Sequence, residues 1–138
     1  MIQSLREQLI RDEEERLKVY TDSVGVPTIG VGRNLRDKGI SKAESAFMLD
    51  NDIAEYTWAV GAALPWLGQL DEVRQEVLVN MAFNMGVGGL LGFKRTLASV
   101  KSGAYERASV EMMESKWAQQ VGPRAHRLAK QMRTGERQ

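Results

Sequence analysis

One short stretch of the chain, LKVYTDSVGVPTIGVGRNL at residues 17–35, has the pattern of β-strands, whereas the segments on both sides of it are spaced like helices. Strand-forming residues surround Asp22, Gly25 and Pro27, which are residue types that turns favour, so the stretch predicts a hairpin or small sheet. The chain is therefore expected to be α+β, mainly helical, with one small β element set into a helical body.

Apolar residues at steps of three and four predict the helices. The first helix is expected to end at about Glu14. Ser41 followed by Glu44 is a capping-box pattern, and it predicts the start of a long helix over about 42–62. Further helices are expected over residues 71–86, 93–102, 104–119 and 123–133, with a tight connection at 88–93.

The length and composition indicate one globular domain. The chain has 138 residues, of which 43% are hydrophobic and 27% charged, enough to bury a core. A net charge of +1 gives little attraction for nucleic acid.

The residue types and segments that the chain lacks exclude several kinds of site. The chain has no cysteine and a single histidine, which excludes disulfides and Cys-based metal sites and is too little for a histidine cluster. No stretch has the apolar run of a signal peptide or of a membrane span. The protein is therefore expected to be soluble in the cytoplasm where it is made, and no metal or cofactor is implied.

Three consecutive glutamates, Glu13, Glu14 and Glu15, lie at the end of the first predicted helix. Because a helix turns about 100° per residue, Glu13 falls within roughly 10° of the centre of the apolar stripe, and Glu15 lies on the far face. Only Glu13 is therefore aimed into the protein. Burial raises the pKa of a carboxyl group, as a general acid requires near neutral pH. The alternative is a half-buried Glu13 that an arginine holds for structural reasons.

Asp22 is a second candidate acid, in the predicted turn between two strands. A turn aspartate usually accepts hydrogen bonds from its own backbone, and that role alone would explain it. With Glu13, however, it forms a pair in which one acid has an apolar setting and the other a polar one, which separates two carboxyl pKa values. Glycoside hydrolysis uses such a pair. Thr28, on the returning strand, is either an ordinary strand former or a hydroxyl that helps to hold a water beside Asp22.

These residues carry a resemblance to a known family. Glu13, Asp22 in RLKVYTD and Thr28 in PTIGVG resemble, in identity and spacing, the active-site segment of the phage T4-type lysozymes, endolysins that cleave peptidoglycan. Three further stretches resemble the helical lobe of the same family: 71–93, 115–117 and 123–135. The resemblance thus covers nearly the whole chain, with its four stretches in the same order.

The resemblance implies a lysozyme-like, two-lobed fold and a catalytic triad. The small lobe would span about 14–40, a connecting helix about 42–62, and the helical lobe about 64–138 together with the first helix. Glu13 would be the general acid, Asp22 the carboxylate that positions water, and Thr28 the third member. Arg124 would pair with Glu13 across the lobes. The implied reaction is hydrolysis, with inversion, of the β-1,4 bond between N-acetylmuramic acid and N-acetylglucosamine. Inversion requires carboxyl groups roughly 6.5–9.5 Å apart.

The resemblance also implies partners and a location. The substrate would be the glycan chains of peptidoglycan, with no nucleic acid, and the enzyme would act as a monomer. It would stay in the host cytoplasm until lysis. A separate holin-type membrane protein would then be needed for the enzyme to reach the wall.

Further residues are assigned by the same resemblance. Arg33 stands where the family prototype has a histidine, and Asp52 matches the acidic partner of that histidine, which predicts an Arg33–Asp52 ion pair. Glu14 replaces the glycine that usually follows the catalytic acid. The connection after Asn34 is shorter than in the prototype, so the small lobe should be reduced. Four residues fall at positions that contact the sugar chain, the last two with a different residue type: Phe83, Thr96, Asn34 and Glu111.

Two other functions remain open from the sequence. A lytic transglycosylase would use a glutamate without a water-holding aspartate and would release a 1,6-anhydro product. A non-enzymatic helical module would disturb membranes through the basic C-terminal segment, because its charges attract anionic surfaces. That segment carries Arg124, His126, Arg127, Lys130, Arg133 and Arg137.

Overall fold

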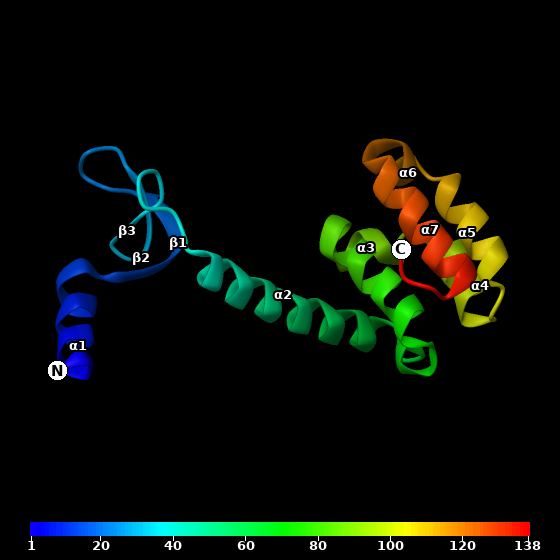
Figure 1. Ribbon diagram of the computed structural model, residues 1–138, viewed down its shortest axis with the longest axis horizontal. Helices are drawn as coiled ribbons and strands as arrows, with labels where there is room; N and C mark the ends of the chain where they lie inside the picture. Colours follow the sequence, from blue (N-terminus) through cyan, green and yellow to red (C-terminus); the bar gives the residue numbers. More distant parts are fainter. The chain divides into compact units, whose positions relative to one another are not determined.

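Seven α-helices and a three-stranded antiparallel sheet make up the protein, which confirms the predicted α+β class. The computed structural model describes all residues, 1–138. They fall into two units, Met1–Met48 and Leu49–Gln138, and the helix α2 (Lys42–Ala63) contributes residues to both (Figure 1). The predicted assignment of the first helix to the helical lobe stays a prediction.

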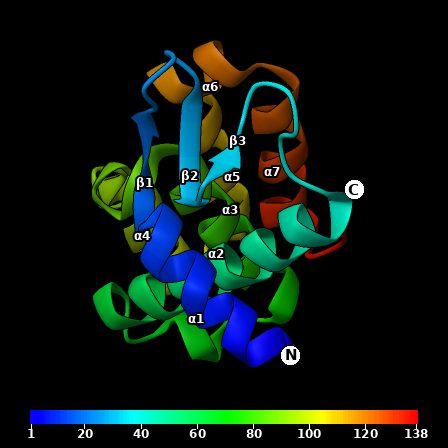
Figure 2. The ribbon, with the colours of Figure 1, turned by 90° about the vertical axis from the view of Figure 1, so that its left-hand side faces the viewer.

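The N-terminal unit contains the first helix followed directly by the sheet. Helix α1 spans Ile2–Glu13 and ends where the sequence predicts. Strand β1 (Glu15–Thr21) pairs with β2 (Pro27–Val31), and β2 pairs with β3 (Arg33–Asn34). Figure 2 shows the three strands side by side with β2 at the centre. The predicted hairpin is therefore confirmed, and a short third strand is added to it.

The register of the sheet puts Thr28 at its centre. Thr28 lies opposite Tyr20 on β1 and opposite Asn34 on β3. It is 4% exposed and is the only buried residue of this unit. A buried hydroxyl needs a hydrogen-bond partner, so the position of Thr28 in the sheet requires a polar group beside its side chain.

The junction between α1 and β1 has an unusual backbone. Glu14 has φ 61° and ψ 136°, and it is the only non-glycine residue with a positive φ. Such a conformation costs a residue with a side chain about 1–3 kcal/mol, whereas glycine adopts it readily. A glycine at this position would make the same turn from helix to strand without that cost.

Glu14→Gly should raise the free energy of unfolding by about 1 kcal/mol, because relief of the strained backbone outweighs the extra entropy of an unfolded glycine. The exposed pair between Glu14 and Arg16, at 3.5 Å, contributes little that the substitution would lose. Thermal unfolding should show a rise in Tm of roughly 2–5 °C. Glu15→Gly, inside β1, is the matched control and should lower Tm. A lower Tm for Glu14→Gly would contradict this account of the junction.

The start of α2 confirms the predicted capping box. The backbone N–H of Glu44 donates to Ser41 Oγ at 3.1 Å, and the N–H of Ser41 donates to Glu44 Oε1 at 2.8 Å. Two amides that the first helical turn cannot satisfy are thereby paired. Glu44 has a second partner on the sheet, described below.

The C-terminal unit is a group of helices around one apolar core. Val77, Leu78 and Met81 of the third helix are fully buried, together with Val60 at the end of α2. Helices α5 and α7 pack side by side (Figure 1). The helices are α3 (Glu72–Leu91), α4 (Lys94–Lys101), α5 (Tyr105–Met113), α6 (Lys116–Val121) and α7 (Pro123–Thr134), with a 3₁₀ turn at Leu67–Gln69.

Two predicted helix boundaries are wrong. Gly86 has φ 82° and ψ 160° and kinks α3, but helical turns resume and continue to Leu91, so 88–93 is not simply a connection. Leu90 is fully buried, and its burial favours the return to helix after the kink. The predicted helix at 104–119 is two helices, because Ser115 caps the second by accepting the N–H of Ala118 at 3.1 Å.

No single helix is both long and apolar enough to cross a membrane. The pair α3 and α4 passes on length and composition only when both are taken together across a bend of 103°. Buried core residues lie on both of these helices.

Candidate active site

Asp22 closes the turn between β1 and β2. Its Oδ1 accepts the backbone N–H of Val24 at 3.0 Å and that of Val26 at 2.8 Å, and its own N–H donates to Val26 O at 2.9 Å. The turn role that the sequence offered as an alternative is therefore real. Both side-chain bonds use the same oxygen, so Oδ2 forms no hydrogen bond within the protein. The carboxylate is fixed in position and keeps one oxygen available as an acceptor.

Thr28 is connected to Asp22 through the same carbonyl group. Its hydroxyl lies 2.9 Å from Val26 O, the acceptor that also receives the Asp22 amide. A carbonyl oxygen only accepts, so the Thr28 hydroxyl must donate its proton to Val26, and its lone pairs remain as acceptors. The turn thus presents two acceptors, a carboxylate oxygen and a hydroxyl oxygen, held by one short backbone segment.

Glu13 is the last residue of α1, at the opposite end of β1 from Asp22. The apolar setting predicted for it is not found within this unit, since α1 has no buried residue and Glu13 is exposed. The Glu13 carboxylate lies instead against the backbone of Gly32, between β2 and β3. The helical periodicity placed Glu13 on the apolar face of α1, but the apolar residues of that face are exposed within the N-terminal unit.

Arg33 forms an ion pair with Glu44 within the N-terminal unit. Its predicted partner, Asp52, belongs to the other unit, so that pairing stays a prediction. Nη1 and Nη2 of the guanidinium donate to the two Glu44 carboxylate oxygens at 2.9 and 2.8 Å, and Nη1 also donates to Gly39 O at 3.1 Å. Glu44 lies about two helical turns before Asp52 on α2 and is itself part of the capping box at the start of that helix. The bidentate pair links β3 to the first turn of α2.

The hydrogen bonds from Arg33, with those from the Ser41 backbone and side chain, lower the pKa of Glu44 from 4.5 to about 2. A carboxyl group with a lowered pKa stabilises the folded state above its unfolded pKa, and this contribution is lost as the pH falls toward the folded value. The link between the sheet and α2 should therefore weaken between pH 4.5 and about 2.

Glu44→Gln should reduce the decline in stability over that pH interval, because the amide does not titrate. Urea unfolding at several pH values between 4.5 and about 2 measures it. Asp50→Asn, which removes an exposed acid further along the same helix, is the control and should leave the decline in place. An unchanged pH dependence in Glu44→Gln would show that this pair does not control acid stability.

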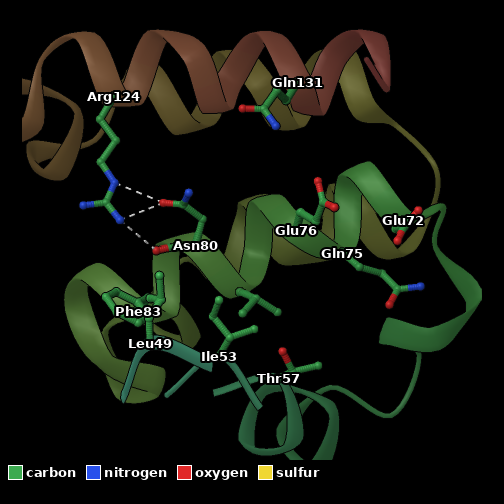
Figure 3. A pocket seen from close by; sticks show the side chains of 11 residues that line it. Leu49, Ile53, Thr57, Glu72, Gln75, Glu76, Asn80, Phe83, Arg124 and Gln131 are labelled. Atoms are coloured by element: carbon green, nitrogen blue, oxygen red, sulfur yellow. Dashed lines mark hydrogen bonds between the residues drawn. The ribbon is translucent and has the colours of Figure 1, made fainter. Parts of the chain in front are cut away.

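A pocket of about 550 Å³ lies within the C-terminal unit, between residues of α2, α3 and α7 (Figure 3). Leu49, Ile53 and Phe83 give it apolar walls. Arg124 of α7 reaches Asn80 of α3, donating from Nε at 3.0 Å and from Nη2 at 2.8 Å to Asn80 Oδ1. The Arg124 Nη1 forms no hydrogen bond. Glu13, the predicted partner of Arg124, belongs to the other unit, so that pairing stays a prediction.

The other predicted sugar-binding residues have varied surroundings. Phe83 is 39% exposed and stacks at a tilt on Tyr56, with ring centroids 5.2 Å apart. Asn34 Oδ1 accepts the backbone amides of Arg36 and Asp37, both at 2.9 Å, so its side chain stabilises a turn. The sugar-contacting roles of both residues stay predictions.

Thr96 and Glu111 line a separate hollow of about 270 Å³ between α4 and α5. Thr96 is 3% exposed. Glu111 is half-buried, accepts the Ser99 hydroxyl at 2.5 Å and lies 3.9 Å from Arg95 Nε. Thr96 and Glu111 therefore line the same hollow, and the predicted contact of each with sugar stays a prediction.

Two asparagines of α3 that the sequence analysis missed bind side chains of later helices. Asn80 orients Arg124, and Asn84, one helical turn later, accepts the indole N–H of Trp117 at 2.7 Å. The signal was present, because two asparagines four residues apart in an apolar helix need partners on the same face. What they bind could not be read from the sequence.

Comparison with known proteins decides which family the chain belongs to. The family model described as phage lysozyme matches residues 11–134. The chain belongs to the phage lysozyme family. The match includes both units and every residue of the candidate site, so the chain is a glycoside hydrolase domain of the lysozyme class.

The relatives come from phages and from a eukaryote. The chain is 28% identical over 98% of its length to probable T4-type lysozyme 1 of Dictyostelium discoideum, 96% of which is matched. It is 32% identical over 96% of its length to the pre-baseplate central spike protein of Enterobacteria phage T4, but spans only 28% of that protein. It is also 32% identical to the endolysin of Salmonella phage P22, over 62% of each chain.

Proposed function

We propose that this lysozyme hydrolyses the β-1,4 bond between N-acetylmuramic acid and N-acetylglucosamine in peptidoglycan. The observation that carries the proposal is the pair of acceptors at the β1–β2 turn. A water that donates one proton to Asp22 Oδ2 and the other to Thr28 Oγ1 keeps a lone pair free for attack. This is the arrangement expected of a residue pair that positions water.

In the proposed reaction, Glu13 acts as the general acid and Asp22 as the general base. Glu13 donates its proton to the glycosidic oxygen as the bond to the anomeric carbon breaks. The water attacks that carbon from the opposite face and gives its proton to Asp22, so the configuration inverts. Arg124 is proposed to support Glu13 through the guanidinium edge that Asn80 leaves free. No cofactor takes part.

The proposed biological role is host-cell lysis. The relative from Salmonella phage P22 is named an endolysin, which supports this role. On this proposal the enzyme acts as a monomer, remains in the host cytoplasm until lysis, and reaches the wall with the help of a holin-type membrane protein.

Asp22→Asn separates the turn role from the catalytic role. Asparagine retains an oxygen that accepts the Val24 and Val26 amides, so the Tm should stay within about 2 °C of wild type. Removal of the base should lower kcat on purified peptidoglycan roughly 10²–10⁴-fold. Asp22→Ala, by contrast, should also lose about 1–2 kcal/mol of stability. Full activity in Asp22→Asn would show that Asp22 serves the turn alone.

Product analysis distinguishes the proposed hydrolase from the two alternatives. Wild type should release reducing muropeptides, identified by mass spectrometry, whereas Glu13→Gln should release none. A 1,6-anhydro product would identify a lytic transglycosylase. Killing of cells that survives Glu13→Gln but not a joint Lys130→Gln and Arg133→Gln substitution would favour the membrane-active module.

A further inference from the structure

We propose that Gly32 is a positioning residue for Glu13, because the bare backbone at position 32 is the surface against which the Glu13 carboxylate lies. The inference rests on the proposed role of Glu13 as the acid. It assigns a function to a residue that has no side chain with which to form hydrogen bonds or carry a charge.

The contact is too close to admit a side chain at position 32. A Cβ atom built on Gly32 would lie 2.9 Å from Glu13 Oε2, 3.1 Å from Cδ and 3.4 Å from Cγ. Real Cβ atoms essentially never lie as close as 2.9 Å to another atom, so a methyl group would displace the carboxylate end of Glu13. A general acid must be held within about 0.5 Å of its productive position, so such a displacement impairs proton transfer.

The backbone around Gly32 is held on both sides of the contact. Gly32 has φ +69° and lies between β2 and β3. The next residue, Arg33, is fixed by its bidentate pair with Glu44. On the other side of the contact, the chain leaves α1 through the positive φ of Glu14. A rigid turn therefore faces the end of the helix that carries the acid.

Gly30 offers a matched control. It lies on β2 with the same φ of +69°, and a Cβ atom there would meet nothing within 4 Å. Gly30→Ala and Gly32→Ala therefore impose a similar backbone penalty, because alanine resists positive φ in both places. Only Gly32→Ala adds the collision with Glu13.

The test compares the two alanine variants of the full chain on purified peptidoglycan and in thermal unfolding. Gly32→Ala should lower kcat roughly 10- to 100-fold beyond any effect of Gly30→Ala, with little change in KM. Because the Glu13 carboxylate is the end of an exposed side chain and can move away, Gly32→Ala should lower Tm about as much as Gly30→Ala does.

Each outcome decides one of the two claims. Equal kcat values for Gly30→Ala and Gly32→Ala would overturn the positioning role. A Tm for Gly32→Ala far below that of Gly30→Ala would show that the loss of activity comes from misfolding and not from Glu13, and would also overturn it. An inactive wild type would instead refute the proposed function, on which the positioning role rests.

Discussion

The N-terminal unit depends on backbone that changes direction through positive φ. Glu14, Gly30 and Gly32 all have φ between 61° and 69°, and they lie at the end of the first helix and around the central strand. The first of these turns takes the chain from Glu13 into β1, and the last leaves open the space that the Glu13 carboxylate uses. The site therefore depends on conformations that most residues resist, and Glu14 adopts one despite its side chain.

In the proposed mechanism, one side chain fills both a structural and a catalytic role. Asp22 uses one carboxylate oxygen to hold its turn and leaves the other available, and Thr28 donates its proton to Val26 and leaves its lone pairs available. The hydrogen bonds that fix the turn thereby fix the acceptors that a water would need. Pre-organisation of this kind lowers the cost of positioning the nucleophile.

In the C-terminal unit, single polar groups on α3 hold the later helices. Arg74 donates from Nε to Met132 O at 2.7 Å and from Nη2 to Arg133 O at 3.0 Å, and its guanidinium lies 3.7 Å from the centroid of the Tyr105 ring. Asn80 accepts hydrogen bonds from the Arg124 guanidinium at the start of α7. The Arg74 bonds satisfy carbonyl groups at the C-terminal end of α7, so α3 contacts both ends of the helix that carries the proposed partner of Glu13.

The sequence by itself determined whatever depends on neighbours along the chain. The capping box at Ser41, the hairpin and the turn role of Asp22 each involve residues within a few positions of one another, so local chemistry was sufficient to predict them. The tertiary structure alone decided the partner of Arg33, the return to helix after Gly86, and the surroundings of Glu13. In each case the outcome depends on which distant groups meet, and on where apolar surface is buried, and a helical or strand period does not contain that information.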